Sequence, residues 1–536
     1  MKKILFLLTL FISFTSLAQE EDAWVYFSDK PNAPTYLSNP LTMLSQRALD
    51  RRTAQNIALD VTDVPVYQNY IDQITTATGI TVMAKSKWLN ALHVRGTQVA
   101  IQNLETLAFV SSIDFANTTL NTKLNHPKTT KIKEVNKQLE DLTTYNYGNS
   151  ANQVQMLNGH LLHQQNYTGQ GKIIAVLDSG FIGVNTAAPF QNLITNNQIL
   201  GGYNFPDRNT NYFSRHNHGT SVLSCMGGFV DGQLVGTAPD AQYYLFITED
   251  VNDENPVEES YWVEAAEVAD SLGVDVINSS LGYFEYDNPS YSYSYSDMNG
   301  TIAFASRGAD MAFSKGMMVV ISAGNSGNSS NPHIGVPAEA TNVLAVGAVD
   351  NNEVYASFSS IGPSFDGRVK PDVCAKGVLT TVSNTSGNII TSSGTSFASP
   401  VMAGMVATFW SAVPSLTNIE VMQFIKQSAD LFANPTAQKG YGVPDFQLAL
   451  TNALNTKQFT IETPILYPNP ATTQLNIISK ITNGTFLLFN SLGQLVKEQN
   501  ISQKAQSFSI EDLNSGIYYY QLSSPNYSSQ GKIIKQ

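Results

Sequence analysis

Hydrophobic residues in the middle of the chain form short apolar runs separated by stretches with helical periodicity. The runs lie at 172–177, 243–248, 274–279, 317–322 and 343–349. The helical stretches lie at 218–227, 261–272, 303–315, 395–411 and 418–428. Strands that are apolar on both faces and separated by helices are typical of a parallel sheet covered on both sides. This region is therefore predicted to be a doubly wound α/β domain that ends near residue 455.

The region before this domain has a different pattern. Strands are predicted at 24–28 and 110–115, one or two strands within 80–95, and helices at 66–76 and 97–107. A polar stretch at 117–150, rich in Thr, Asn and Lys, has little to bury and indicates a linker. We expect a small α+β domain joined to the central domain by this linker.

From residue 464 onward the chain alternates short apolar strands with turn signals. The strands are predicted at 475–478, 486–490, 495–498, 517–522 and 532–535. Asn483-Gly484, Leu492-Gly493 and Asn514-Ser515-Gly516 mark turns between them. This pattern predicts a separate small β-sandwich of about 70 residues.

The first residues have the composition of a secretory signal peptide. Lys2 and Lys3 precede an apolar run at 4–14, and Ser16-Leu17-Ala18 supplies the small residues of a cleavage site. The run is too short to span a bilayer comfortably. We expect residues 1–18 to direct export, followed by 19–144, 145–455 and 465–536 as the three further parts of the chain.

Composition narrows the function classes. The chain has 536 residues, a net charge of −13 and no stripe of Lys and Arg, which argues against nucleic acid or an anionic membrane as its main partner. It has only two cysteines, Cys225 and Cys374, so it is not a disulfide scaffold. Two buried thiols are the expectation.

Three residues of the central domain lie where α/β sheets carry their chemistry. Asp178 ends the run at 172–177, His218 begins the helix at 218–227, and Ser396 lies at the start of the helix at 395–411. Each alone has an ordinary structural explanation, because an Asp before Gly is often a turn residue and a Ser at a helix start is often a cap. Pro400 is expected to lie within the first turn of its helix, where its missing N–H is not needed. Nearby His216 is expected to be a surface histidine.

Asn325 follows the run at 317–322, in Ala323-Gly324-Asn325-Ser326-Gly327. It is either a plain turn residue or an amide that hydrogen-bonds an oxyanion together with the Ser396 N–H.

Taken together, these segments resemble the subtilisin-like serine protease family (subtilases, peptidase family S8). The order Asp, His, Asn, Ser agrees, as do Asp178-Ser179-Gly180, His218-Gly219-Thr220, the segment around Asn325 and Gly394-Thr395-Ser396. The resemblance implies peptide-bond hydrolysis through an acyl-enzyme, with Ser396 as nucleophile, His218 as general base and then acid, and Asp178 orienting the imidazole. It also implies that Asn325 serves the oxyanion hole and that Ser280, Leu281 and Gly282 bind substrate.

The flanking regions resemble other parts of secreted precursors. Residues 23–115 are similar to the α+β propeptide that subtilases use as a folding aid and inhibitor, although a permanent accessory domain is the alternative. The C-terminal region resembles the type IX secretion sorting domain of Bacteroidota, on the evidence of Tyr467-Pro468-Asn469-Pro470 and Gly531-Lys532-Ile533-Ile534-Lys535. The resemblance implies polypeptide substrates, the chain's own propeptide and the type IX secretion machinery as partners. It implies a secreted or cell-surface enzyme.

Two loops bear on specificity and metals. The segment at 249–259 carries six acidic residues in eleven, which are usually a solvated loop but could favour basic substrates or hold Ca²⁺. No cofactor is required for triad chemistry, Ca²⁺ is a candidate structural ion, and its ligands are unknown. The tyrosine-rich segment at 283–295 is either an exposed loop or a lining of the substrate cleft.

Two rival functions fit the sequence less well. An α/β-hydrolase esterase would need Gly-x-Ser-x-Gly and the order Ser, Asp, His, whereas this chain has Ala398 at the last motif position and a different order. A non-catalytic adhesin on a protease fold would not need all four catalytic positions. The sequence therefore favours a self-processing serine endopeptidase.

Overall fold

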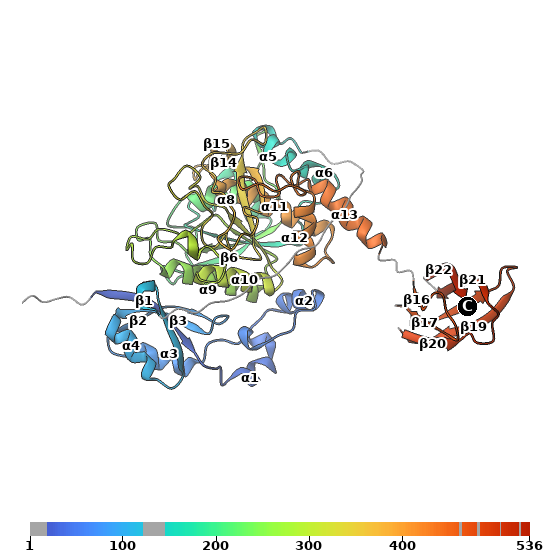
Figure 1. The fold of residues 1–536 in the computed structure, drawn as a ribbon. Coiled ribbons are helices and arrows are strands. Elements are labelled where there is room, and N and C mark those ends of the chain that lie inside the picture. The colour runs from blue at the N-terminus through green and yellow to red at the C-terminus, as the bar shows by residue number, and fades with distance from the viewer. Residues whose placement is uncertain (1–18, 122–144, 460–463, 480–482, 504, 525–526) are drawn as a thin grey trace, which may run out of the picture. The chain divides into compact units, whose positions relative to one another are not determined.

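The structure is a computed structural model, and it describes the chain except residues 1–18, 122–144, 460–463, 480–482, 504 and 525–526 (Figure 1). The predicted signal peptide and most of the predicted linker therefore lie outside the described residues. The chain divides into two compact units, Met1–Asn452 and Ala453–Gln536. The first unit contains both the N-terminal domain and the α/β domain.

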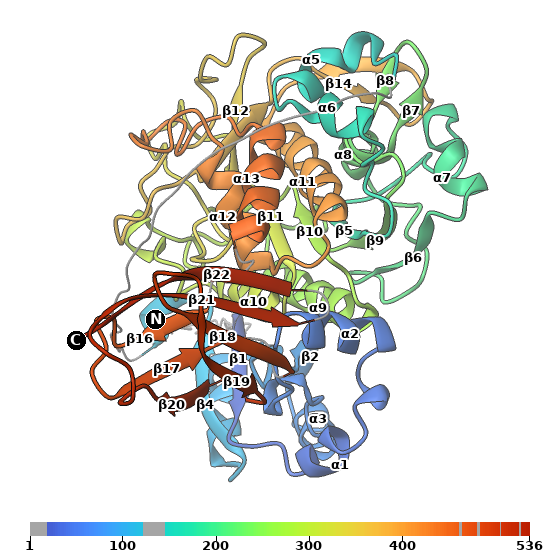
Figure 2. The ribbon, with the colours of Figure 1, turned by 90° about the vertical axis from the view of Figure 1, so that its right-hand side faces the viewer.

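The α/β domain is built on a seven-stranded sheet in the order β13-β12-β11-β10-β5-β9-β6. All of its strand pairs are parallel, which confirms the predicted fold class. Figure 2 shows β11, β10, β5, β9 and β6 following one another across the sheet. The strands are β5 (Ile173–Asp178), β6 (Ile199–Asn204), β9 (Gln242–Ile247), β10 (Val276–Ser279), β11 (Met318–Ser322), β12 (Leu344–Val349) and β13 (Val373–Lys376).

Helices cover both faces of this sheet because its strands are apolar on both sides. Helices α8 and α11 pack together against one face, and α9 and α10 pack together against the other. Helices α12 and α13 follow α11 along the chain. Their bounds are α8 (His218–Gly227), α9 (Val257–Leu272), α10 (Phe304–Ser314), α11 (Thr395–Ala412), α12 (Asn418–Gln427) and α13 (Phe446–Phe459).

The N-terminal domain has a four-stranded antiparallel sheet in the order β2-β3-β1-β4. The sheet lies between its own helices and the pair α9 and α10 (Figure 1). The elements are β1 (Glu20–Phe27), α3 (Gln68–Thr75), β2 (Ile80–Ser86), β3 (Ala91–Thr97), α4 (Gln98–Asn103) and β4 (Val110–Phe115).

Strand β1 is buried on both faces, which explains its nearly continuous burial. Ala23, Val25 and Phe27 point into the core that the sheet shares with α3 and α4. The alternate residue Trp24 stacks on Phe304 of α10 at 5.1 Å between ring centroids and donates its indole N–H to the Ser260 hydroxyl at 2.9 Å. The strand therefore belongs to the core of its own domain and to the interface with the α/β domain at once.

Sequence patterning missed the segment between β1 and α3. It contains α1 (Ala33–Leu37), η1 (Pro40–Thr42), α2 (Gln46–Ala54) and η2 (Val61–Asp63). Helix α2 buries Arg51 and Arg52 together with Ala48, so its inner face is largely charged. A search for apolar periodicity does not detect a helix that buries charged side chains.

The second unit contains two antiparallel sheets, β16-β17-β20 and β19-β18-β21-β22, that share one core. That core combines Leu475 and Phe508 from the first sheet with Phe486 and Leu522 from the second. The predicted strand-rich C-terminal domain is thus confirmed, with β16 and β20 as additional strands. The bounds are β16 (Ile465–Tyr467), β17 (Gln474–Ile478), β18 (Gly484–Phe489), β19 (Leu495–Ile501), β20 (Ala505–Ser509), β21 (Gly516–Ser524) and β22 (Tyr527–Lys535).

Cys225 and Cys374 are both buried free thiols, as expected. Among the described residues, no helix is long and apolar enough to cross a membrane.

Candidate active site

Asp178 and His218 meet where strand β5 ends and helix α8 begins. The first residue of α8 is His218, and the second is Gly219. A side chain at position 219 would place its Cβ 2.5 Å from the Gly180 carbonyl oxygen and 2.9 Å from the Asp178 Cβ. Glycine is therefore needed for the helix to start this close to the strand.

The Asp178 carboxylate is fully buried and is held by short hydrogen bonds. Its Oδ1 accepts from the Ser179 backbone N–H at 2.7 Å and from His218 Nδ1 at 2.8 Å. Because Nδ1 is the donor in this pair, the neutral His218 ring carries its lone pair on Nε2. That nitrogen is then available to accept a proton.

The same contact sets the acidity of His218. Burial alone would lower the pKa of His218, but the charge of Asp178 and its hydrogen bond outweigh burial and raise the pKa above the ordinary value. Asp178 therefore stabilises the imidazolium form. Nearby His216 is exposed, and its Nδ1 lies 3.3 Å from the Ser179 hydroxyl.

Ser396 is the second residue of helix α11 and is half-buried. Its hydroxyl donates to the Ser280 carbonyl at 3.4 Å. The side chains of Ser396 and His218, both within the described residues, form no hydrogen bond with each other. The ring of Phe397 lies 5.9 Å from that of His218, so the histidine does border the start of α11. Catalytic hydrogen bonds are often long without substrate, so this geometry is compatible with a nucleophile and its base.

Pro400 lies inside helix α11 and beyond its first turn, contrary to the prediction. Its missing N–H would otherwise bond the carbonyl of Ser396, four residues earlier. The Ser280 hydroxyl takes that place, donating to the Ser396 carbonyl at 2.9 Å. Ser280 therefore replaces the lost helical hydrogen bond and ties the end of β10 to the residue that carries the candidate nucleophile.

The predicted substrate-binding segment follows β10 directly. Ser280 is buried against Ser396, Leu281 is half-buried and Gly282 is exposed. The segment thus leads from the start of α11 toward solvent.

Asn325 lies in the loop after β11 and its side-chain amide is oriented by α11. Its Oδ1 accepts from the Thr395 N–H at 2.9 Å and from the Thr395 hydroxyl at 3.0 Å. The amide nitrogen forms no hydrogen bond with any described residue, and Asn325 is exposed. A free amide donor is therefore held beside the N-terminus of the helix that carries Ser396.

The acidic segment 249–259 and the tyrosine-rich segment 283–295 are joined by hydrogen bonds. The Tyr283 hydroxyl donates to Glu249 at 2.6 Å, while those of Tyr286 and Tyr293 donate to Glu259 at 2.7 and 2.6 Å. Both carboxyls are buried, as are Tyr283 and Tyr286. The solvated-loop interpretation is therefore wrong for Glu249 and Glu259, and the exposed-loop interpretation is wrong for these tyrosines.

Burial also raises the pKa values of three carboxyls in the segment 249–259. It raises the pKa of Glu258 to about 8, and it raises the pKa values of Glu249 and Glu259 as well. Glu258 accepts from the backbone N–H of Asp250 at 2.7 Å. Hydrogen-bond donors thus occupy oxygens of all three carboxyls, Glu249, Glu258 and Glu259. Within the described parts of the chain, no group of three or more His, Cys, Asp or Glu side chains is arranged to hold a metal ion.

Three parts of the chain match known family models. Residues 22–134 match the peptidase S8 propeptide domain of Bacteroidota, 169–444 match the subtilase family, and 465–536 match a secretion system C-terminal sorting domain. The subtilase match contains Asp178, His218, Asn325 and Ser396.

Two bacterial subtilisins support the same grouping, and one solved structure is similar at lower identity. Subtilisin NAT from Bacillus subtilis subsp. natto is 31% identical over 299 residues, which cover 55% of this chain and 70% of that protein. Subtilisin DY from Bacillus licheniformis is 30% identical over 278 residues, which cover 52% of this chain and 90% of that protein. The solved structure of MycP1 with its N-terminal propeptide removed aligns at 23% identity and a TM-score of 0.45, covering 56% of this chain and 96% of that one.

The contact between Asp178 and His218 predicts a measurable pKa. His218 should titrate above the ordinary histidine value of about 6.5, and Asp178→Asn should lower its pKa because the charge that favours imidazolium is removed. The contribution of the Asp178–His218 contact to the free energy of unfolding is present below the ordinary histidine pKa and is lost as the pH rises through the raised pKa of His218. Histidine NMR across pH on the two proteins tests this, with circular dichroism as the control for folding. An unchanged pKa in the variant would show that Asp178 does not set it.

Proposed function

This chain belongs to the subtilase family of serine endopeptidases, and from that premise we propose that Asp178, His218 and Ser396 are the triad with which it hydrolyses peptide bonds in proteins. The observation that carries the proposal is the hydrogen bond from His218 Nδ1 to the buried Asp178, which leaves Nε2 to act as the base. The family match and the order of the motifs support it.

In the first half of the reaction, the Ser396 hydroxyl oxygen attacks the carbonyl carbon of the scissile bond while His218 Nε2 takes its proton. Asp178 stabilises the imidazolium that results. The negative charge that develops on the substrate oxygen is met by Asn325 Nδ2 and the Ser396 N–H at the N-terminus of α11. Collapse of the tetrahedral intermediate breaks the C–N bond, and His218 gives its proton to the leaving amine.

In the second half, water replaces the amine and the same residues act again. His218 takes a proton from the water that attacks the acyl-enzyme, and it returns a proton to Ser396 when the ester bond breaks. Ser280, Leu281 and Gly282 bind the substrate backbone beside Ser396, consistent with the contacts between Ser280 and the start of α11.

The enzyme is a precursor that processes itself in this proposal. Its N-terminal domain, which matches the S8 propeptide model, is the inhibitor that must leave, and cleavage falls between the two domains of the first unit. The C-terminal unit, which matches the sorting-domain model, directs the protein through the type IX secretion machinery to the medium or the cell surface.

Replacing the nucleophile tests the assignment most directly. Ser396→Ala should abolish peptidase activity, self-processing and labelling by a fluorophosphonate probe, because no other group can form the acyl-enzyme, while the fold stays intact. Ser393→Ala, in an exposed serine of the same stretch, is the matched control and should keep all three. Full activity in Ser396→Ala would refute the triad.

The oxyanion assignment predicts a graded loss. Asn325→Ala should lower kcat by about 10²–10³-fold with little change in KM, because the lost donor acts on charge that exists only in the transition state. Asn328→Ala, in an exposed asparagine of the same loop, should keep the parent kcat. Equal kcat values for the two variants in steady-state peptide hydrolysis would contradict the role of Asn325.

The C-terminal assignment predicts a change in location. Deletion of residues 465–536 should trap the protein in the periplasm, because the sorting signal is lost while the export signal is kept. Immunoblots of periplasm, cell surface and medium measure the distribution, with the full chain as control. Normal secretion of the shortened chain would rule out this role.

A further inference from the structure

A segment of the N-terminal domain contacts the α/β domain on the side away from Ser396. This segment, residues 28–65, connects β1 to α3 and includes α1 and α2; we call it the arm. The Ser45 N–H donates to the Ser271 carbonyl at 2.8 Å, and the Gln55 amide donates to the Gly316 carbonyl at 2.8 Å. Arg47 donates to the Gly273 and Gly171 carbonyls at 2.9 and 3.0 Å.

These contacts share one location in the fold. Gly171, Gly273 and Gly316 lie two or three residues before strands β5, β10 and β11, so they lie at the amino-terminal edge of the parallel sheet. Asp178 and Asn325 lie at the carboxyl-terminal ends of β5 and β11. The arm therefore binds the edge of the sheet opposite to the candidate active site.

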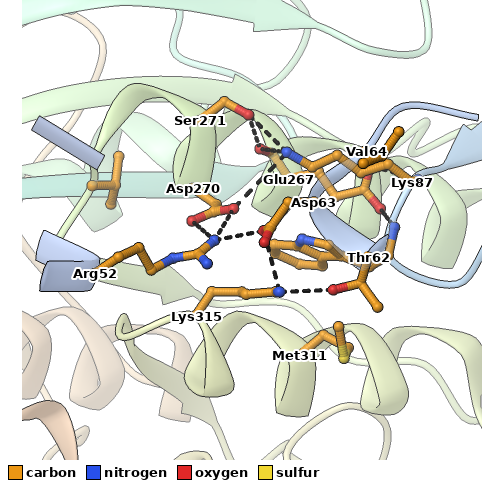
Figure 3. Close-up of polar contacts among 12 residues, drawn as sticks. Arg52, Thr62, Asp63, Val64, Lys87, Glu267, Asp270, Ser271, Met311 and Lys315 are labelled. Atoms are coloured by element: carbon orange, nitrogen blue, oxygen red, sulfur yellow. Dashed lines mark hydrogen bonds and ion pairs between the residues drawn. The ribbon is translucent and has the colours of Figure 1, made fainter. Parts of the chain in front are cut away.

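The centre of the contact is Asp270, near the C-terminal end of α9 (Figure 3). Arg52 Nη2 lies 2.9 Å from both carboxylate oxygens of Asp270. Arg51 also pairs with this carboxylate. Asp270 is fully buried, and Arg52 is 1% exposed. Arg51 and Arg47 in addition bond the carbonyls of Val274 and Gly273, where the dipole of α9 favours positive charge.

A second group of charges continues the network in the other direction (Figure 3). Asp63 of the arm accepts from Arg52 at 2.9 Å and pairs with Lys315 of the α/β domain at 3.2 Å. Lys315 also donates to the Thr62 hydroxyl at 2.7 Å, and both Asp63 and Lys315 are buried. Burial alone would raise the pKa of Asp63, but the Arg52 hydrogen bond and charge lower it overall. Charges of alternating sign thus cross the interface from Asp270 to Lys315.

Removing one partner from such a network is costly. A buried ion without its counter-ion has lost its hydration and has no ion pair to compensate for it. The state in which the two domains are bound is therefore strongly destabilised. Asp270 serves two arginines at once, so it is the residue on which attachment of the arm depends most.

We propose that the arm anchors the N-terminal domain to the α/β domain, in addition to the contact of strand β1 with α9 and α10. The site of the arm around Asp270 sets how long this domain stays bound once the linker is cut. The proposal rests on the self-processing precursor proposed above. None of the arm contacts involves Asp178, His218, Asn325 or Ser396, so cleavage of the linker or occupation of the active site breaks none of them. The arm therefore keeps its contacts with the α/β domain after either event.

The test separates anchoring from catalysis by using the full chain with Ser396→Ala. A recognition site for an exogenous protease is inserted within 122–144, the chain is immobilised through its C-terminus, the linker is cut, and dissociation of the N-terminal fragment is followed by surface plasmon resonance. The fragment should stay bound after the cut. Asp270→Asn should raise its dissociation rate constant about tenfold or more, because truncating one member of a buried charge pair acts mainly on dissociation.

Two further variants make the outcome decisive. Asp240→Asn, in an exposed carboxylate whose backbone contacts Thr168, should dissociate as the parent does. Arg47→Ala changes only the arm, at a half-exposed side chain, and should also raise the dissociation rate constant. It replaces Asp270→Asn as the test variant if Asp270→Asn does not fold. Immediate loss of the fragment from the parent, or rates for Asp270→Asn and Arg47→Ala within about twofold of the parent, would overturn the anchor. Failure of the proposed enzyme function would instead appear as absent fluorophosphonate labelling of the chain that retains Ser396. The dissociation measurement does not depend on that labelling, because it uses Ser396→Ala.

Discussion

The hydrogen bond between Asp178 and His218 is the contact on which the rest of the site depends. A carboxylate with no solvent exposure is costly without hydrogen-bond donors, and His218 supplies one of those that reach Asp178 Oδ1. Gly219 permits the approach by removing the side chain that would strike Gly180 and Asp178. One bond thereby fixes the histidine tautomer, raises the histidine pKa and holds the start of α8 against the end of β5.

The parallel sheet then brings the remaining groups to the same edge. Strands β5, β10 and β11 are neighbours, so Asp178, Ser280 and Asn325 follow strands that end side by side. Helix α11 completes the site, because Thr395 orients the Asn325 amide and Ser280 bonds the Ser396 carbonyl. Residues that are distant in the sequence meet here because every strand of the sheet runs in the same direction.

Much of this arrangement could be predicted from the sequence. Apolar runs located the five central strands β5, β9, β10, β11 and β12, and the segments around Asp178, His218, Asn325 and Ser396 predicted the candidate site. What patterning could not find is polar burial that depends on a distant partner. Arg52 is buried because Asp270 is there, Glu259 because tyrosines of a later loop reach it, and Pro400 is tolerated in a helix because Ser280 replaces a hydrogen bond. Such pairs leave no local signal.

Strand β1 carries a consequence for how this precursor can evolve. One set of its side chains packs inside the N-terminal domain, and the other, including Trp24, packs on Phe304 and Ser260 of the α/β domain. A change at Trp24 must be matched on α9 or α10, while a change at Val25 must be matched within its own domain. The two domains are therefore expected to diverge together, and an N-terminal domain taken from a distant relative would be a poor substitute for this one.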